Sequence, residues 1–139
     1  MLNFISCSQE KGISVPEAMK LIDSEKFIFL DAREINEHKA SRIKGARFVG
    51  YENFNLNKEN FDSDKIYIVY CSVGKRSLEV VNQLTKAGFN ALNLEGGLFA
   101  WSNSELPLFN SSDNITKKIH GYNREWSKKV LKGEVILDE

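Results

Sequence analysis

A cysteine followed by two basic residues marks the part of the chain best suited to chemistry. Cys71 ends an apolar run, and residues 71–76, CSVGKR, continue with Gly74, Lys75 and Arg76. The thiolate is the nucleophilic form of cysteine, and backbone amides, nearby cations and a helix N-terminus all stabilise it. We therefore expect Cys71 to be a catalytic nucleophile.

The other residues of this segment are expected to bind the substrate. Gly74 permits a tight turn in which successive backbone amides surround the sulfur. The residues expected to line this turn are Ser72, Val73, Gly74, Lys75 and Arg76. The guanidinium of Arg76 is suited to an oxyanion, and Lys75 is the weaker candidate because a lysine at a loop edge is commonly just solvated. The alternative is that Cys71 is a small hydrophobic residue at a strand end, but its polar neighbours favour the catalytic interpretation.

Strands and helices alternate around this segment. FIFLD, IYIVY and NALNL are short apolar runs, as parallel strands covered on both faces are. Helices are predicted over residues 15–23, from Arg76 to Gly88 and in EGGLFAWSNS, where apolar positions and capping residues recur at helical spacing. The pattern predicts an α/β fold with helices on both faces of a parallel sheet. Cys71 then lies at the carboxyl end of a strand, where such sheets bind ligands.

Composition excludes several classes of protein. The chain has 139 residues, enough for one domain, and its 19 basic and 19 acidic side chains cancel, so nucleic-acid binding is not indicated. No apolar stretch approaches the roughly 20 residues that a membrane-spanning helix needs. Cys7 and Cys71 are too few and too far apart to suggest a disulfide framework or a metal site. A reducing, cytoplasmic location is the simplest expectation.

Both ends of the chain differ from its middle. Residues 1–11 are expected to be a frayed tail; the alternative, suggested by the apolar run before Cys7, is a truncated lipoprotein signal and hence a periplasmic or membrane-anchored protein. Residues 109–139 are expected to be a C-terminal extension with one helix that lays Trp126 on the main domain. That helix is predicted from the near-helical spacing of Tyr122, Trp126, Val130 and Leu131. Its basic residues are interpreted as a solvated face.

Four segments together resemble a single-domain rhodanese, a sulfurtransferase module. They are DAREINEH at residues 31–38, IKGA at 43–46, CSVGKRS at 71–77 and LEGGLFAW at 94–101. The resemblance covers about residues 12–108 and implies a rhodanese-like fold with a central five-stranded parallel sheet. It also implies that Cys71 takes a sulfane sulfur from a donor such as thiosulfate and holds it as a persulfide. Cyanide, a small-molecule thiol or a protein thiol then accepts the sulfur, and no metal or cofactor takes part.

Further residues are expected to support the loop. They are Asp31, Arg33, Arg42 and Ser77. Asp31 and Arg33, together with Glu37, are interpreted as an ion-pair network that holds loops in place. His38 is expected at the surface. Arg42 precedes IKGA where the family commonly has a glycine and a histidine, and it is expected to add positive potential near the pocket.

Two other classes of function stay open. In phosphatase loops the arginine is six positions beyond the cysteine, with five residues between them. Here Arg76 is only five positions beyond Cys71, so the loop is one residue shorter. This shorter loop disfavours hydrolysis of phosphate esters. A non-catalytic docking module or a protein-to-protein sulfur carrier would use the same fold, because a fold alone does not fix a function. The intact Cys71 disfavours an inactive scaffold but is compatible with a persulfide relay.

Overall fold

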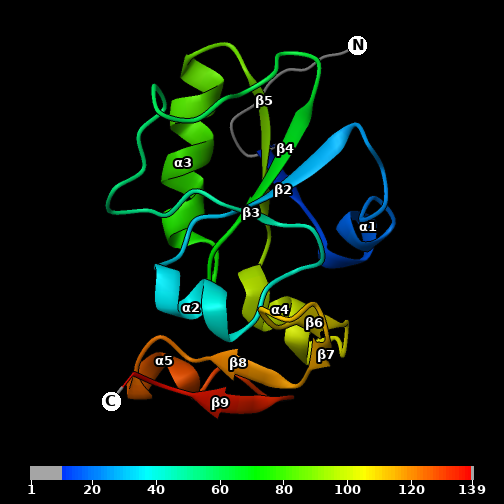
Figure 1. The fold of residues 1–139 in the computed structure, drawn as a ribbon, viewed down its shortest axis with the longest axis vertical. Helices are drawn as coiled ribbons and strands as arrows, with labels where there is room; N and C mark the ends of the chain where they lie inside the picture. The colour runs from blue at the N-terminus through cyan, green and yellow to red at the C-terminus, as the bar shows by residue number, and fades with distance from the viewer. Residues whose placement is uncertain (1–10, 139) are drawn as a thin grey trace.

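A five-stranded parallel sheet forms the centre of the molecule (Figure 1). The computed structural model describes residues 11–138. The strands follow the order β1-β5-β4-β2-β3. Their bounds are β1 (Gly12–Ile13), β2 (Phe27–Asp31), β3 (Arg47–Phe48), β4 (Ile66–Tyr70) and β5 (Asn90–Leu94). This sheet confirms the predicted α/β fold, and its three longest strands are the three apolar runs of the sequence.

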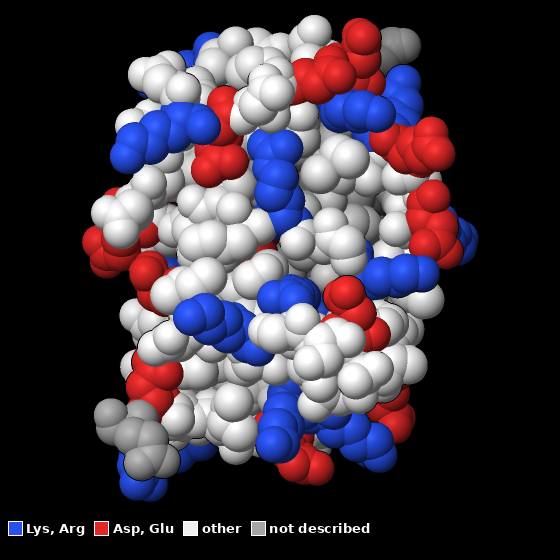
Figure 2. Space-filling view, in the orientation of Figure 1, with Lys and Arg blue, Asp and Glu red and all other residues white. Residues whose placement is uncertain are grey.

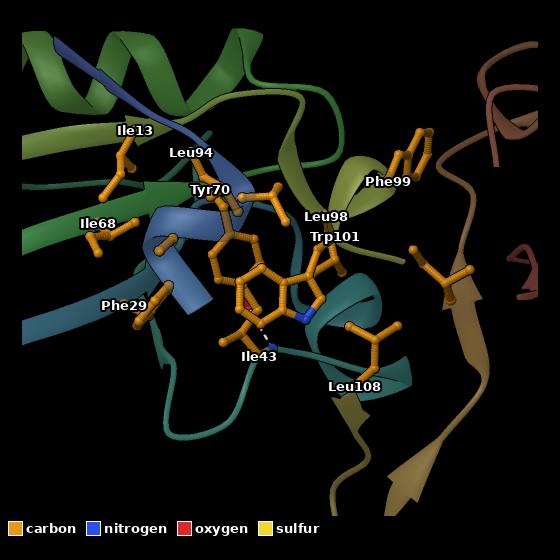
Figure 3. Packing of buried hydrophobic residues seen from close by; sticks show 13 residues of the cluster. Ile13, Phe29, Ile43, Ile68, Tyr70, Leu94, Leu98, Phe99, Trp101 and Leu108 are labelled. Carbon is orange, nitrogen blue, oxygen red and sulfur yellow. Dashed lines mark hydrogen bonds between the residues drawn. The ribbon is translucent and has the colours of Figure 1, made fainter. Parts of the chain in front are cut away.

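Alternate residues of β4 supply the cores on the two faces of the sheet. Ile68 and Tyr70 point into a cluster that includes Trp101, whereas Tyr67 and Val69 point into a second cluster on the opposite face. Figure 3 shows the first cluster, in which the Trp101 ring lies between strand residues and Leu108. Burial on both faces explains why β4 is apolar at every position.

Helices cover both faces of the sheet. They are α1 (Val15–Met19), α2 (Ile35–Ala40), α3 (Lys75–Lys86) and α4 (Gly97–Asn103). In α3, Val80, Val81 and Leu84 form the buried stripe that the helical spacing predicted. α1 begins after its Ser14 cap, as expected, but ends at Met19, and the residues that follow form turns. The prediction of a helix over residues 15–23 is therefore too long.

The C-terminal extension contains short strands and one short helix. β6 (Leu108–Phe109) pairs antiparallel with β7 (Ile115–Thr116), and β8 (Lys118–His120) pairs parallel with β9 (Glu134–Ile136). The helix α5 (Arg124–Ser127) lies between β8 and β9 along the chain. The longer helix expected from Tyr122 to Leu131 is wrong. Tyr122 has a left-handed φ of 72°, which a continuous helix does not accept, and α5 has only four residues.

The extension is bonded to the C-terminal end of α4. The side chain of Asn103 donates to Lys129 O at 3.0 Å and accepts from Leu131 N at 2.7 Å, while Ser102 Oγ donates to Lys132 O at 2.7 Å. Ile119 of β8 is fully buried in the cluster around Trp101. Figure 1 shows β8, β9 and α5 at the bottom of the molecule, close to α2 and α4. The extension therefore lies at the carboxyl end of the central strands.

Three other features bear on the expectations from sequence. The N-terminal tail with Cys7 lies outside the described residues. Over the part of the chain that the structure describes, no helix has the length and apolar character needed to cross a bilayer. Figure 2 shows basic and acidic side chains interspersed over one face, with no large area of a single sign. That face therefore has no extended basic surface for nucleic acid.

Candidate active site

Cys71 follows β4 directly and begins the loop that leads into α3. The residue is only 1% exposed. Its sulfur accepts hydrogen bonds from Gly74 N at 3.1 Å, from Ser77 N at 3.4 Å and from Ser77 Oγ at 3.3 Å. Of the amides expected to surround the sulfur, the structure brings that of Gly74 to it, and the second amide comes from Ser77, one residue beyond the expected segment. This setting can hold negative charge on the sulfur.

Asn93 on β5 supports this loop from the neighbouring strand. Its side chain donates to Gly74 O at 3.0 Å and accepts from Ser77 Oγ at 2.5 Å. Because a serine hydroxyl has one proton and its shorter contact is to Asn93, the two amides are the main donors to the sulfur. Asn93 was not predicted from the sequence. The available signal was a polar residue inside the otherwise apolar strand NALNL.

The first residues of α4 hold the loop from the other side. Leu98 N donates to Cys71 O at 2.8 Å, and Phe99 N donates to Ser72 O at 3.0 Å. Gly97 has a left-handed φ of 64°, and a Cβ there would lie 2.5 Å from Ser72 O and 2.6 Å from Cys71 O. Only glycine lets the two backbones approach this closely. The segment LEGGLFAW thus fixes the base of the active loop.

Arg76 and Ser72 both bond to Glu37 of α2. Arg76 Nη1 and Nη2 donate to the two carboxylate oxygens at 2.9 and 3.0 Å, and Ser72 Oγ donates to Glu37 Oε1 at 3.1 Å. Burial raises the pKa of Glu37, but the hydrogen bonds and charge of Arg76 outweigh it and lower that pKa. The guanidinium that we expected to bind a donor oxyanion is therefore paired within the protein. Its contact with the donor stays a prediction.

Asp31 and Arg33 form a fully buried ion pair behind the loop. Arg33 donates to the Asp31 carboxylate at 2.6 and 2.8 Å, and His38 Nδ1 lies 2.8 Å from the same carboxylate. Burial raises the pKa of Asp31, but the charge and hydrogen bonds of Arg33, together with His38, lower it to about 2. The expectation that His38 lies at the surface is wrong, because the side chain is buried against its carboxylate partner.

This buried network joins several loops to the sheet. Arg33 donates to Ser41 O at 2.7 Å. The Tyr70 hydroxyl donates to Asp31 at 3.1 Å and accepts from Ile43 N at 3.2 Å, the bond drawn in Figure 3. Since His38 and Glu37 are neighbours on α2, the same helix contacts the buried ion pair and the active loop.

Arg42 lies against the start of the extension. Its backbone exchanges hydrogen bonds of 2.9 and 2.8 Å with Phe109, and its side chain donates to Asn110 O at 3.3 Å. Arg42 does not line the pocket at Cys71, and its contribution to the positive potential there stays a prediction. The residue instead fastens the β6 segment to the loop before β3.

A pocket of about 180 Å³ opens at Cys71. Two of its lining residues come from the C-terminal extension, which was expected to pack on the domain and was not assigned to the site. The lining residues are Cys71, Ser72, Val73, Lys75, Arg76, Tyr122 and Trp126. The guanidinium carbon of Arg76 lies 4.7 Å from the Tyr122 ring centroid, and Lys75 Nζ lies 5.3 Å from that of Trp126. Within residues 11–138, no group of three or more His, Cys, Asp or Glu side chains is arranged to hold a metal ion.

The chain belongs to the rhodanese-like domain family, whose model matches residues 14–104. It is 32% identical to the putative sulfurtransferase YtwF of Bacillus subtilis, over 70% of this chain and 95% of that protein. It is also 30% identical to the thiosulfate sulfurtransferase GlpE of Pseudoalteromonas translucida, over 66% of this chain and 88% of the relative. A rhodanese-related protein from Thermoplasma volcanium superposes with a TM-score of 0.65 at 26% identity, covering 70% and 96% of the two chains.

These similarities confirm the predicted family and support sulfurtransferase activity in general. The family match ends at residue 104, before the extension that contributes Tyr122 and Trp126 to the pocket.

Proposed function

We propose that this protein moves a sulfane sulfur from a donor to a thiophilic acceptor through a persulfide on Cys71. The observation that carries the proposal is the position of the Cys71 sulfur. It accepts hydrogen bonds from two backbone amides and lies beside a pocket at the end of β4. Relatives named as sulfurtransferases support the same class of reaction.

The reaction has two displacement steps. With thiosulfate as donor, the Cys71 thiolate attacks the outer sulfur, the sulfur–sulfur bond breaks, and sulfite leaves with the electron pair. A cyanide ion or a thiolate then attacks the outer sulfur of the persulfide, and the Cys71 thiolate is the leaving group. Sulfur is transferred without an external oxidant or reductant. The amides of Gly74 and Ser77 stabilise the Cys71 thiolate, which attacks in the first step and leaves in the second.

The Glu37–Arg76 pair favours sulfur transfer over phosphate-ester hydrolysis. A phosphatase needs an arginine whose two donors face the phosphate, whereas both nitrogens of Arg76 that form the fork donate to Glu37. The short loop, in which Arg76 is five positions beyond Cys71, supports the same choice.

Intact mass measurement after incubation with thiosulfate tests the proposal. The wild-type protein should gain one sulfur atom that dithiothreitol removes, and thiosulfate with cyanide should yield thiocyanate. The Cys71→Ser variant should do neither. Cys7→Ser is the matched control, since it removes the other cysteine of the chain and should leave both results unchanged. Sulfur uptake and normal turnover by Cys71→Ser would overturn the proposal.

A further inference from the structure

The extension completes the entrance to the active site with two aromatic rings. Tyr122 and Trp126 line the pocket at Cys71 although both lie beyond the family match. With Val73 they give the entrance apolar walls. The volume of about 180 Å³ is far above the roughly 10–15 Å³ that one water needs, so an organic group fits there.

The backbone of Tyr122 has a conformation that is unfavourable for a residue with a large side chain. Its φ of 72° is in the left-handed region, which a bulky residue occupies at a cost in free energy. Its N–H donates to His120 Nδ1 at 3.0 Å, and His120 Nε2 lies 2.9 Å from Asp138 Oδ1. The Tyr122 residue nevertheless stays 46% exposed, so little burial offsets this cost. Its position therefore points to a role at the pocket.

Trp126 is held by a backbone hydrogen bond and by packing on the core. The Asn123 side chain caps α5 by accepting from Trp126 N at 2.8 Å. Val130, a few residues on, packs with Trp126 against the cluster around Trp101. These contacts place both residues at the pocket beside Cys71.

The rings also contact the cations that would otherwise attract a small inorganic anion. The Arg76 guanidinium has Glu37 at its edge and the Tyr122 ring at its face, while the Lys75 ammonium faces the Trp126 ring. An inorganic dianion gains nothing from apolar walls, whereas a carbon-containing group gains contact area on both rings.

Building on the proposed function, we propose that Tyr122 and Trp126 select a donor whose sulfane sulfur is carried on an organic group, a low-molecular-weight organic persulfide. The Cys71 thiolate attacks the outer sulfur of the persulfide, the bond between the two donor sulfurs breaks, and the organic thiolate leaves with the electron pair. The proton of the outer sulfur stays on it or passes to water. The carbon group packs on the two rings during this step.

Single-turnover persulfide formation tests the proposal with two probes, glutathione persulfide and thiosulfate. Samples are alkylated at short times, and the rate constant for sulfur uptake at Cys71 is read from intact mass. The informative variants are Tyr122→Gly, in which glycine suits the left-handed backbone while the ring is removed, and Trp126→Leu, which keeps apolar volume. Leu131→Ala is the control, because Leu131 is an exposed residue of the same extension that does not line the pocket.

The ratio of the two rate constants is the decisive quantity. The rate constant with glutathione persulfide, divided by that with thiosulfate, should fall in each ring variant. In the double variant it should fall by about ten-fold, because the ring surfaces removed by the substitutions contact only the organic donor. The control should keep the wild-type ratio. An unchanged ratio in the double variant, or an equal loss with both donors, would overturn the selectivity. Absence of sulfur uptake by wild-type Cys71 from either donor would instead overturn the proposed function on which the selectivity rests.

Discussion

Glu37 and Arg76 lie fork to fork, joined by parallel hydrogen bonds of 2.9 and 3.0 Å. Their side chains are only 3% and 16% exposed, so water screens the pair weakly. Glu37 belongs to α2 and Arg76 to the first turn of α3, where the active loop ends. The pair therefore fastens the loop to a helix that is also bonded to the buried Asp31.

Removing one partner of this pair should destabilise the fold. In Arg76→Ala the Glu37 carboxylate stays buried without its main partner, and we expect a loss of about 2–4 kcal/mol in the free energy of unfolding measured with urea. Lys44→Ala is the control, because its contact with Asp23 is between exposed side chains and should contribute less than about 1 kcal/mol. Equal losses in the two variants would contradict the importance of the Glu37–Arg76 pair.

Stability should fall in acid as Asp31 is protonated. The pKa of Asp31 is lowered from the ordinary 3.8 to about 2, so the folded state binds this proton less tightly than the unfolded chain. The resulting stabilisation, on the order of 2 kcal/mol, is complete above about pH 4 and is lost as the pH falls toward 2. The lowered pKa of Glu37 acts in the same direction.

Urea unfolding between pH 6 and 2 measures this contribution. Asp31→Asn should be less stable at pH 6, because Arg33 loses its charged partner, and should show a shallower decline toward low pH. Asp23→Asn, which changes an exposed carboxylate, should follow the wild-type curve. A wild-type slope in Asp31→Asn would show that another carboxylate carries the effect.

Gly97→Ala should damage the active loop. The new Cβ would lie 2.5 Å from Ser72 O, so the loop or α4 must move. We expect a loss of roughly 1–3 kcal/mol in stability and a marked drop in persulfide formation at Cys71. Gly45→Ala is the matched control, since Gly45 has a similar φ of 72° but no atom within 4 Å of an added Cβ. It should show the backbone strain alone and keep wild-type persulfide formation.

Ser77→Ala should slow persulfide formation only moderately. The variant loses the hydroxyl contacts with Cys71 and Asn93 but keeps the backbone amide that donates to the sulfur. One lost hydrogen bond corresponds to about a 2- to 10-fold decrease in the single-turnover rate constant with thiosulfate. Ser111→Ala, an exposed serine bonded to Lys39 O, should behave as wild type. Complete loss of activity in Ser77→Ala would mean that the hydroxyl takes part directly in the reaction.

The sheet and the position of Cys71 could be predicted because their signals are local. FIFL and IYIVY are short apolar runs, the first followed by Asp31 and the second by Cys71 and Ser72, so a few neighbouring positions indicate both the strand and its end. The partners of the loop could not be predicted in this way. Glu37 and Arg76 are 39 positions apart, and only the folded sheet brings them together. The same holds for Asn93, which lies on β5, beside the strand that Cys71 follows.

The extension was harder to predict because the spacing of its apolar residues fits both a long helix and the observed short helix between two paired strands. Tyr122, Trp126 and Val130 recur every four residues, as in a helix. The strands β8 and β9 nevertheless pair across 13 intervening residues, and Gly133, with a left-handed φ of 122°, lies just before β9. Long-range pairing thus overrides the local pattern. His38 was misplaced for a related reason, since its buried partner Asp31 belongs to another element.

The helix α4 is bonded at both of its ends to parts of the active site. Leu98 and Phe99 near its start donate to the carbonyls of Cys71 and Ser72, and Asn103 at its end bonds to the segment that follows Trp126. The seven residues of α4 therefore act as a spacer between the loop that begins at Cys71 and the segment that carries Trp126. Adding or removing one residue within α4 would rotate these two sets of bonds relative to each other, so we expect the segment with Trp126 to shift relative to the Cys71 sulfur while the central sheet stays in place.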